Sequence, residues 1–287
     1  MTEPICFGVL GGDRRQVYLA ESLVRNGYEV NTYGFEKTAF HSDVKKSSLD
    51  EISDQCSIVI LPLPVTLDGT TLKADYAALP IPLNDDFAEK MRGKRVFGGM
   101  TSRLYPTSEI WKEINVEDYG AREEFAIRNA GPTAEGAAAI AMNEYPGTIG
   151  GSRCLIAGFG RVGKALAHLL RGMGAHVFVA ARKPADLAWI QTLGYHPVPM
   201  EELGGSDSYD MIFNTVPAML FTRHILSELR GCALLVDLAS APGGVDFEAA
   251  EKIGIKALLA PSLPGVVAPK TAGEIIRETV CRMIGEQ

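Results

Sequence analysis

Short apolar runs of strand length recur along the chain, and most of them end in glycine, proline or a small polar residue. Between them lie longer segments in which apolar residues recur at helical spacing. Continuous apolar runs of this length are typical of strands buried on both faces of a parallel sheet. The predicted strands are 5–10, 29–35, 57–61, 95–100, 116–119, 153–157, 176–181, 211–217, 234–240 and 255–260. Strands that alternate with helices predict an α/β fold.

The segments between these runs predict helices with recognisable ends. One helix follows the first strand and stops at Asn26-Gly27, a common helix C-terminus. A polar helical turn begins at Arg122, and a separate Ala-rich helix is predicted from Pro132 to about Tyr145, because proline is favoured at a helix start. A final helix is expected over about 271–284. In contrast, 62–86 is rich in Pro, Thr and Asp and predicts a long loop, a feature that is often functional.

This order of elements predicts two doubly wound, Rossmann-like domains with a cleft between them. Residues 1–131, joined by about 271–287, form the predicted substrate and catalytic domain, and 132–270 form the nucleotide-binding domain. The helix from Pro132 connects the domains, and the last helix returns to the first. A hydrophobic content of 46% is sufficient for two cores.

Composition narrows the class of protein. The 287 residues carry a net charge of −7 and no basic block, which argues against nucleic acid or an anionic membrane as partner. The N-terminus has no signal-peptide pattern, and no apolar stretch approaches the roughly 18 residues of a membrane span. We therefore expect a cytoplasmic protein. The five cysteines and five histidines are dispersed, so the cysteines are expected to be small buried residues, and no metal site is expected.

The most informative stretch is a G-x-G-x-x-G sequence that lies between an apolar strand and an Ala/Leu-rich helix. This context favours a dinucleotide site over a chance match. Gly158 is expected to make the tight turn, Gly160 to let the backbone approach a pyrophosphate, and Gly163 to let helix and strand pack closely. The start of the helix, Arg161 and Val162, would present N–H groups to the phosphates. The alternative is a glycine-rich turn without a ligand.

The end of the next strand bears on which dinucleotide binds. NAD sites usually place an acidic residue there, roughly 20 residues past the glycines, to bind the ribose 2′-OH. Here Arg182 and Lys183 follow the strand, and two cations suit the 2′-phosphate of NADP. NADP is therefore the predicted cofactor, with NAD as the alternative if Asp186 takes the acidic role. The residues expected beside the nicotinamide half are Asn214, Thr215, Pro217, Asp237, Ala239 and Ser240.

Charged residues also follow the first predicted strand. Asp13, Arg14 and Arg15 come directly after Gly11-Gly12, at the strand end where open α/β sheets bind ligands. The alternative is a helix cap followed by two exposed cations. Because this turn lacks the G-x-G-x-x-G spacing, no second dinucleotide is expected there.

Two polar residues near the start of the predicted 132–145 helix are further candidates. Thr133 and Glu135 are expected to face the cleft, because this helix leads from one domain to the other. The alternative is that they are ordinary residues of a helix N-terminus, where acidic groups interact favourably with the helix dipole.

Five motifs in combination resemble a known family. They are GGDRRQ (11–16), PTAEG (132–136), GFGRVG (158–163), DLASAPGG (237–244) and APSLPGVVAPKTAG (260–273). Together they span essentially the whole chain, which resembles the A subunit of dipicolinate synthase. The last motif is long and specific, whereas the glycine motif alone indicates only a Rossmann fold. Two residues depart from the family pattern: Ala241 stands where Arg is expected, and Ser262 where Gly is expected.

This resemblance implies an oxidoreductase of spore formers that acts on a CH–CH bond. The implied reaction oxidises a dihydrodipicolinate-level intermediate to pyridine-2,6-dicarboxylate (dipicolinic acid), and the implied partner is the flavoprotein-like B subunit of dipicolinate synthase; a homo-oligomer is also expected. A dicarboxylate substrate requires cationic or N–H-rich pockets, and Thr133 could add a hydroxyl donor. The candidate cations are Arg14, Arg15, Arg103 and Lys270. Glu135 or Asp13 could relay a proton if the precursor still carries its hydroxyl.

Two other functions remain open at this point. One is a regulatory or scaffolding protein that binds NADP without turnover. The other is a shikimate- or hydroxyacid-type NADP dehydrogenase. Such dehydrogenases need a positioned Lys–Asp or His-based acid–base set, and the sequence alone does not locate one.

Overall fold

A computed structural model describes residues 5–205, 208–229 and 231–286. The chain divides into two compact units, the first formed by residues up to 128 and from 268 onward, and the second by 129–267. The predicted boundaries between the two domains, at 131/132 and 270/271, lie three residues later in the sequence than these. Within the described residues each unit contains a six-stranded parallel sheet, which confirms the prediction of two Rossmann-like α/β domains.

The first sheet is wound outward in both directions from β1 (Cys6–Leu10). Its strand order is β3-β2-β1-β4-β5-β6, with all neighbours parallel. The other strands are β2 (Glu29–Tyr33), β3 (Lys45–Lys46), β4 (Ile58–Ile60), β5 (Arg95–Gly98) and β6 (Asn115–Asp118). The winding reverses between β1 and β4, and such a switch point is where open α/β sheets bind ligands.

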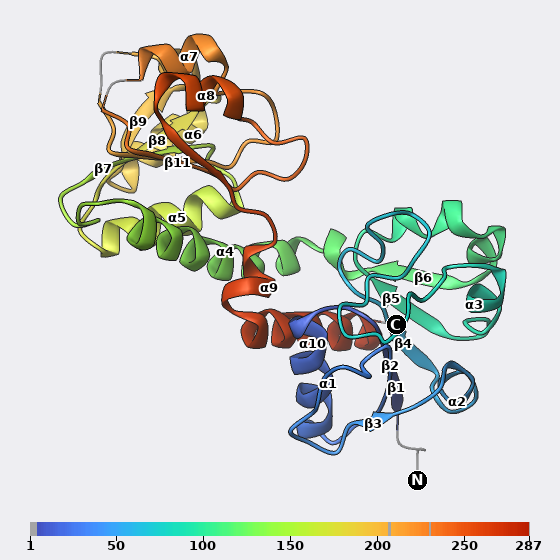
Figure 1. Cartoon of the computed structure of the whole chain (residues 1–287). Coiled ribbons are helices and arrows are strands. Elements are labelled where there is room, and N and C mark those ends of the chain that lie inside the picture. The colour runs from blue at the N-terminus through green and yellow to red at the C-terminus, as the bar shows by residue number, and fades with distance from the viewer. Residues whose placement is uncertain (1–4, 206–207, 230, 287) are drawn as a thin grey trace. The chain divides into compact units, whose positions relative to one another are not determined.

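Two helices far apart in sequence cover one face of this sheet. They are α1 (Arg14–Arg25) and α10 (Pro269–Gly285), which pack side by side (Figure 1). The contact is close, because a Cβ at Gly273 would lie 2.5 Å from the carbonyl oxygen of Arg15. The last helix therefore returns to the first unit, as predicted.

The other face of the first sheet is covered by two short helices, and the rest of the unit is irregular. The helices are α2 (Leu49–Gln55) and α3 (Asp85–Glu89). Short 3₁₀ turns occupy Thr101–Arg103, Tyr105–Thr107, Glu109–Glu113 and Tyr119–Ala121. Between β4 and α3 lies a long loop, residues 61–84, where 62–86 was predicted, and it contains only isolated bridges.

The second sheet repeats the same winding around β7 (Arg153–Ala157). Its strand order is β12-β11-β10-β7-β8-β9, again with all neighbours parallel. The other strands are β8 (His176–Ala181), β9 (His196–Pro199), β10 (Met211–Asn214), β11 (Leu234–Asp237) and β12 (Lys256–Leu259). The switch point lies between β7 and β10.

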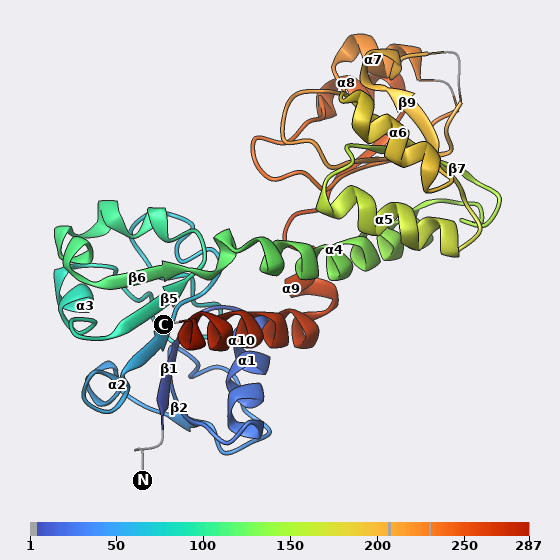
Figure 2. The same ribbon diagram turned by 180° about the vertical axis from the view of Figure 1, so that it is seen from behind.

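Helices cover both faces of the second sheet. One face carries α4 (Glu123–Glu144), α5 (Arg161–Gly172) and α6 (Pro184–Thr192), with α4 beside α5 (Figure 2). The other face carries α7 (Arg223–Glu228) and α8 (Phe247–Ile253). The remaining elements are the 3₁₀ turn Met200–Glu202 and the short helix α9 (Leu263–Val267).

The predicted helix start at Pro132 is wrong. The helix α4 is continuous over 123–144, with Pro132 in its interior. Its true start has Glu123 and Glu124 in the first turn, where acidic side chains interact favourably with the helix dipole. A proline lacks the N–H that bonds to residue i−4, but packing of the buried alanine face outweighs this loss. Thr133 and Glu135 therefore lie within the helix and not at its N-terminus.

The departure at Ser262 coincides with a strained backbone. Ser262, just past β12, has φ +57°, a left-handed conformation that favours glycine. We predict that Ser262→Gly raises the free energy of unfolding by about 1 kcal/mol, since a left-handed Cβ costs roughly 1–2 kcal/mol. Urea denaturation measures the change. Ser102→Gly, at an exposed position with ordinary φ, is the matched control and should not raise the free energy of unfolding. Equal stability of Ser262→Gly and wild type would contradict the prediction.

Candidate functional site

The three glycines after β7 differ in what surrounds them. Gly158 has φ +103°, and a Cβ there would lie 2.4 Å from Thr215 Oγ1. A Cβ at Gly163 would lie 2.1 Å from the carbonyl oxygen of Gly158, so this position requires glycine for close packing of helix and strand. Gly160 caps the N-terminus of α5 and faces open space, with no atom within 4 Å of an added Cβ. The loop thus leaves room for a pyrophosphate at Gly160.

A hollow of about 340 Å³ lies beside this loop. It is lined by Gly158, Phe159, Gly160, Ala181, Arg182, Lys183, Asp186, Met200 and Val216. Arg182 and Lys183 are exposed, whereas Asp186 is half-buried. The structure therefore brings the glycine turn together with the predicted cations and also with the acidic alternative. Arg161 and Val162 form the first turn of α5 next to it.

The polar residues at the ends of β10 and β11 bond to the protein itself. Asn214 and Asp237 are fully buried, and the Asn214 amide donates to Asp237 Oδ1 over 2.8 Å. The Asp237 carboxylate also accepts from the backbone N–H groups of Ala239 and Gly244, at 3.1 and 3.0 Å. Thr215 Oγ1 donates to the Ala157 carbonyl over 2.8 Å. These side chains shape the turns, which leave Pro217 and Ser240 exposed.

In the first unit an ion cluster occupies the switch point between β1 and β4. Asp13 caps the N-terminus of α1. Its carboxylate accepts from the backbone N of Arg15 at 3.0 Å, from Arg15 Nε at 2.9 Å and from Nη2 at 2.7 Å. Arg15 Nη2 also donates to the carbonyl of Leu63, which follows β4, over 2.5 Å. The Arg15 side chain is only 6% exposed. It is therefore a buried cation that joins the two strand ends.

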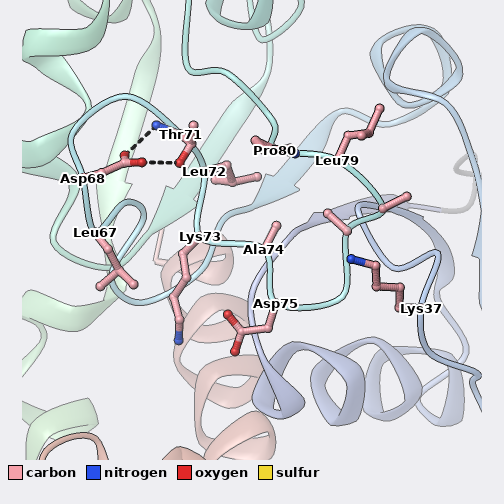
Figure 3. Close-up of a pocket in the computed structure, with 12 residues that line it drawn as sticks. Lys37, Leu67, Asp68, Thr71, Leu72, Lys73, Ala74, Asp75, Leu79 and Pro80 are labelled. Carbon is pink, nitrogen blue, oxygen red and sulfur yellow. Dashed lines mark hydrogen bonds between the residues drawn. The ribbon is translucent and has the colours of Figure 1, made fainter.

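The third member of this cluster is Lys73, which the sequence did not single out. Its ammonium donates to Asp13 Oδ2, and its side chain is 13% exposed. Lys73 lies in the 61–84 loop and lines a hollow of about 370 Å³ (Figure 3). The two consecutive glycines, Gly11 and Gly12, are the sequence feature that could have indicated another segment packing closely against this turn. Both have positive φ.

The charges of this cluster fix the protonation of Asp13. Burial raises the pKa of the Asp13 carboxyl, but hydrogen bonds to Arg15 and Lys73 and their positive charges outweigh burial and hold this pKa well below its ordinary value. Burial lowers the pKa of Arg15, and the bond to Asp13 more than compensates. Asp13 is therefore an ion-paired carboxylate near neutral pH, a state that suits positioning of a neighbour better than proton transfer.

The other predicted anion-binding residues are not gathered at this cluster. Arg14 is exposed and lines a separate hollow with Tyr18 and Tyr76, so adjacent arginines point to different places. Arg103 Nη1 donates to the Thr66 carbonyl over 3.1 Å and so ties down the 61–84 loop. Lys270 is exposed on the first turn of α10.

In the second unit, the two candidates on α4 differ in exposure, since Thr133 is half-buried and Glu135 is exposed. Thr133 Oγ1 donates to the carbonyl of Asn129, one turn earlier, over 2.9 Å. The hydroxyl of Thr133 is thus bonded within its own helix, as is common for threonine in helices.

Across 5–205, 208–229 and 231–286, every helix is too short or too polar to span a bilayer. In that part of the chain no three His, Cys, Asp or Glu side chains gather as a metal ion would require. All five cysteines are free thiols, and Cys6 and Cys56 lie buried with their sulfurs 2.8 Å apart.

Comparison with known proteins identifies the family. The A subunit of dipicolinate synthase from Bacillus subtilis (strain 168) is 34% identical over 282 residues, which cover 97% of this chain and 95% of the relative. The chain belongs to the family of dipicolinate synthase A subunits. The resemblance seen in the sequence is thereby confirmed.

Crystal structures of this family have the same fold. The A chain of dipicolinate synthase from Bacillus subtilis superposes with a TM-score of 0.87 at 32% identity, covering 100% of this chain and 97% of that one. The corresponding protein from Bacillus halodurans gives a TM-score of 0.88 at 31% identity, with 99% and 98% covered.

Two family models divide the chain. Residues 6–107 match the N-terminal domain of the dipicolinate synthase A subunit, and 130–231 match the NAD-binding domain of D-isomer specific 2-hydroxyacid dehydrogenases. The second match contains the Gly158–Gly163 turn and both switch-point strands of the second sheet. The chain therefore carries a dehydrogenase-type domain for a nicotinamide dinucleotide, which is the property of an oxidoreductase.

Proposed function

We propose that this protein is the oxidoreductase component of a dipicolinate synthase. It uses NADP to oxidise a dihydrodipicolinate-level intermediate to pyridine-2,6-dicarboxylate in the cytoplasm of a sporulating cell. The observation that carries the proposal is the 34% identity to the A subunit of dipicolinate synthase over 97% of the chain, combined with an intact glycine turn. In this role it is proposed to work with a flavoprotein-like B subunit and to form a homo-oligomer.

This reaction requires the protein mainly to hold the substrate and the dinucleotide in position. Oxidation would remove two hydrogens from the dihydropyridine ring, one as a hydride and one as a proton to solvent or a nearby group, and the ring would become aromatic. The bound dinucleotide supplies the hydride acceptor. The residues proposed to hold it are those of the glycine turn, Arg182 and Lys183, while the first unit holds the substrate. Aromaticity favours the product, so a strong general base is not required.

The substrate assay is the direct test of this function. Purified protein is supplied with the dihydrodipicolinate precursor and NADP⁺, with and without the B subunit, and the absorbance of pyridine dicarboxylate is followed. Product that depends on the protein and on NADP⁺ is expected. If the protein binds NADPH but forms no product in either mixture, the non-catalytic regulatory or scaffold role takes its place.

NADP preference is a separate prediction. Arg182 and Lys183 line the hollow beside Gly160 and stand where an NAD enzyme carries an acid. Arg182→Ala should weaken NADPH binding by roughly 1–3 kcal/mol, the value of a charge-assisted hydrogen bond, and leave NADH binding unchanged. Nicotinamide fluorescence titration measures both.

The informative comparison for this prediction is Asp186→Asn, because Asp186 lines the same hollow. NADP preference requires that this variant change NADPH binding little. If Asp186→Asn weakens NADH binding while Arg182→Ala affects both cofactors equally, the site is an NAD site and Asp186 binds the ribose.

A second candidate function is favoured by the contact between Lys73 and Asp13. Shikimate- and hydroxyacid-type dehydrogenases need a Lys–Asp or a His-based acid–base set, and Lys73 with Asp13 is a pair of the first kind, in which Asp13 positions the lysine. Turnover of shikimate or of small 2-hydroxy acids with NADP⁺, in the absence of activity on dihydrodipicolinate, would favour this function over the first.

A further inference from the structure

We propose that Lys73 binds one carboxylate of the substrate, and that Asp13 and Arg15 are the residues that position it. This inference rests on the proposed function, since it assigns the anion-binding group of the same site. It differs from the sequence-based prediction, which relied on Arg14, Arg15, Arg103 and Lys270 and did not include Lys73.

The backbone of Lys73 is held from two sides. Its N–H donates to the carbonyl of Val65 over 2.9 Å, and its carbonyl accepts from the N–H of Gly12 over 2.6 Å. A further hydrogen bond joins the same two segments, from the N–H of Asp75 to the carbonyl of Gly12 over 2.9 Å. A residue in the middle of a long loop is therefore fixed against the turn that follows β1.

The glycines of this turn make the approach possible. A Cβ at Gly11 would lie 2.7 Å from the Lys73 carbonyl oxygen, and φ at Gly11 is +59°. Gly12 has φ +103°, and a Cβ there would lie 2.4 Å from Gln16 Oε1. Because the N–H of Gly12 already bonds to Lys73, this turn does not offer that donor to a phosphate. The turn instead serves to bring an ammonium group to the switch point.

The hydrogen-bonding capacity of the cluster leaves donors at Lys73. Both oxygens of Asp13 accept bonds from Arg15, and the Arg15 guanidinium also bonds to Leu63. The Lys73 ammonium has three N–H groups. In the described part of the chain Asp13 is its one hydrogen-bond acceptor, so two N–H groups remain for a ligand.

The charge of the cluster points to an anion. The hydrogen-bonded cluster itself holds two cations and one carboxylate, which is one net positive charge in a largely buried position, while the exposed Asp75, whose charge also acts on Arg15, lines the same hollow as Lys73. The whole chain carries a net charge of −7, so an anionic substrate must be attracted locally. The cluster also lies between β1 and β4, at the switch point where open α/β sheets bind ligands. A substrate carboxylate satisfies all three conditions.

The test is Lys73→Met, which keeps the length of the side chain and removes the charge. Dipicolinate is the probe, titrated by calorimetry, and KM is measured with the dihydrodipicolinate precursor. We expect the dipicolinate Kd and this KM to rise at least about tenfold, with an unchanged NADPH Kd, and Lys73→Arg to recover part of the loss. Lys37→Met is the matched control. Lys37 is exposed, lines the same hollow and lies on the other side of Ala74 and Asp75 (Figure 3).

A second measurement keeps the test decisive if Lys73→Met does not fold. Wild type labelled with ¹³C-lysine is titrated with dipicolinate, and the Lys73 Cε resonance, assigned by its absence from Lys73→Arg, should shift. Wild-type dipicolinate affinity and KM in Lys73→Met, or an unshifted Lys73 resonance, would overturn the inference. If wild type makes the product, the proposed function survives that result. If wild type neither binds dipicolinate nor makes it, both fail together.

Discussion

Gly160→Val abolishes dinucleotide binding while the protein stays folded. Gly160 faces open space at the N-terminus of α5 and has φ −80°, so valine fits the ligand-free protein. Its side chain would occupy the place of the pyrophosphate. Loss of several charge-assisted hydrogen bonds, each worth roughly 1.5–3 kcal/mol, weakens binding by about two orders of magnitude or more. The change at a helix cap should cost only about 1 kcal/mol of stability. A binding titration and a melting curve on one sample measure both effects.

Two variants on the same helix control this result. Gly172→Val, at the other end of α5 and also in open space, should retain binding. Gly163→Val should instead unfold the second unit, because its Cβ meets the Gly158 carbonyl oxygen at 2.1 Å. Tight NADPH binding by Gly160→Val would show that the turn does not hold the pyrophosphate.

Asp13→Asn lowers the free energy of unfolding by about 3–5 kcal/mol, because removal of one partner leaves the other charge buried and unpaired. Here the unpaired charge is Arg15, whose side chain is 6% exposed. Lys73 loses its acceptor at the same time. Urea denaturation of both proteins at neutral pH measures the difference.

The effect of Asp13→Asn also depends on pH. Arg15 and Lys73 hold the pKa of Asp13 below that of an unfolded aspartate, about 3.9. The stabilisation by Asp13 is therefore fully present above about pH 5 and is lost as pH falls through the folded pKa. The gap between wild type and variant should be constant from about pH 6 to 8 and should shrink below about pH 4.

Asp75→Asn is the matched control for this effect, since Asp75 is exposed on the same loop as Lys73. It should change stability by less than about 0.5 kcal/mol. A gap between wild type and Asp13→Asn that does not narrow in acid would mean that Asp13 is not the paired carboxylate described above.

Features that depend on neighbouring residues were predictable from the sequence. Buried parallel strands appear as short apolar runs, and the tight turn at Gly158 and the close packing at Gly163 follow from their spacing within one turn. Pro132 shows the limit of local rules. The preference of proline for helix starts predicted that a helix begins at Pro132. The helix instead continues through Pro132, because its alanine face, which includes Ala134 and Ala137, is buried.

Contacts between distant segments could not be predicted in this way. Lys73 lies 60 residues from Asp13, in a loop with no periodicity that would place it. Asn214 and Asp237 looked like ligand groups because polar residues at strand ends often are. Their hydrogen bond depends on the pairing of β10 with β11, where the two residues stand opposite each other, and strand order and register are set by contacts across the whole sheet.

The pairing of α1 with α10 sets the order in which a nascent chain can fold. The second unit is a continuous segment, 129–267, so it can become compact as soon as the ribosome has released it. The first unit cannot, because one face of its sheet is closed by α10, which is translated only after the whole second unit. The earliest strands must therefore wait for a segment made much later, and until then the side of α1 that packs against α10 stays uncovered.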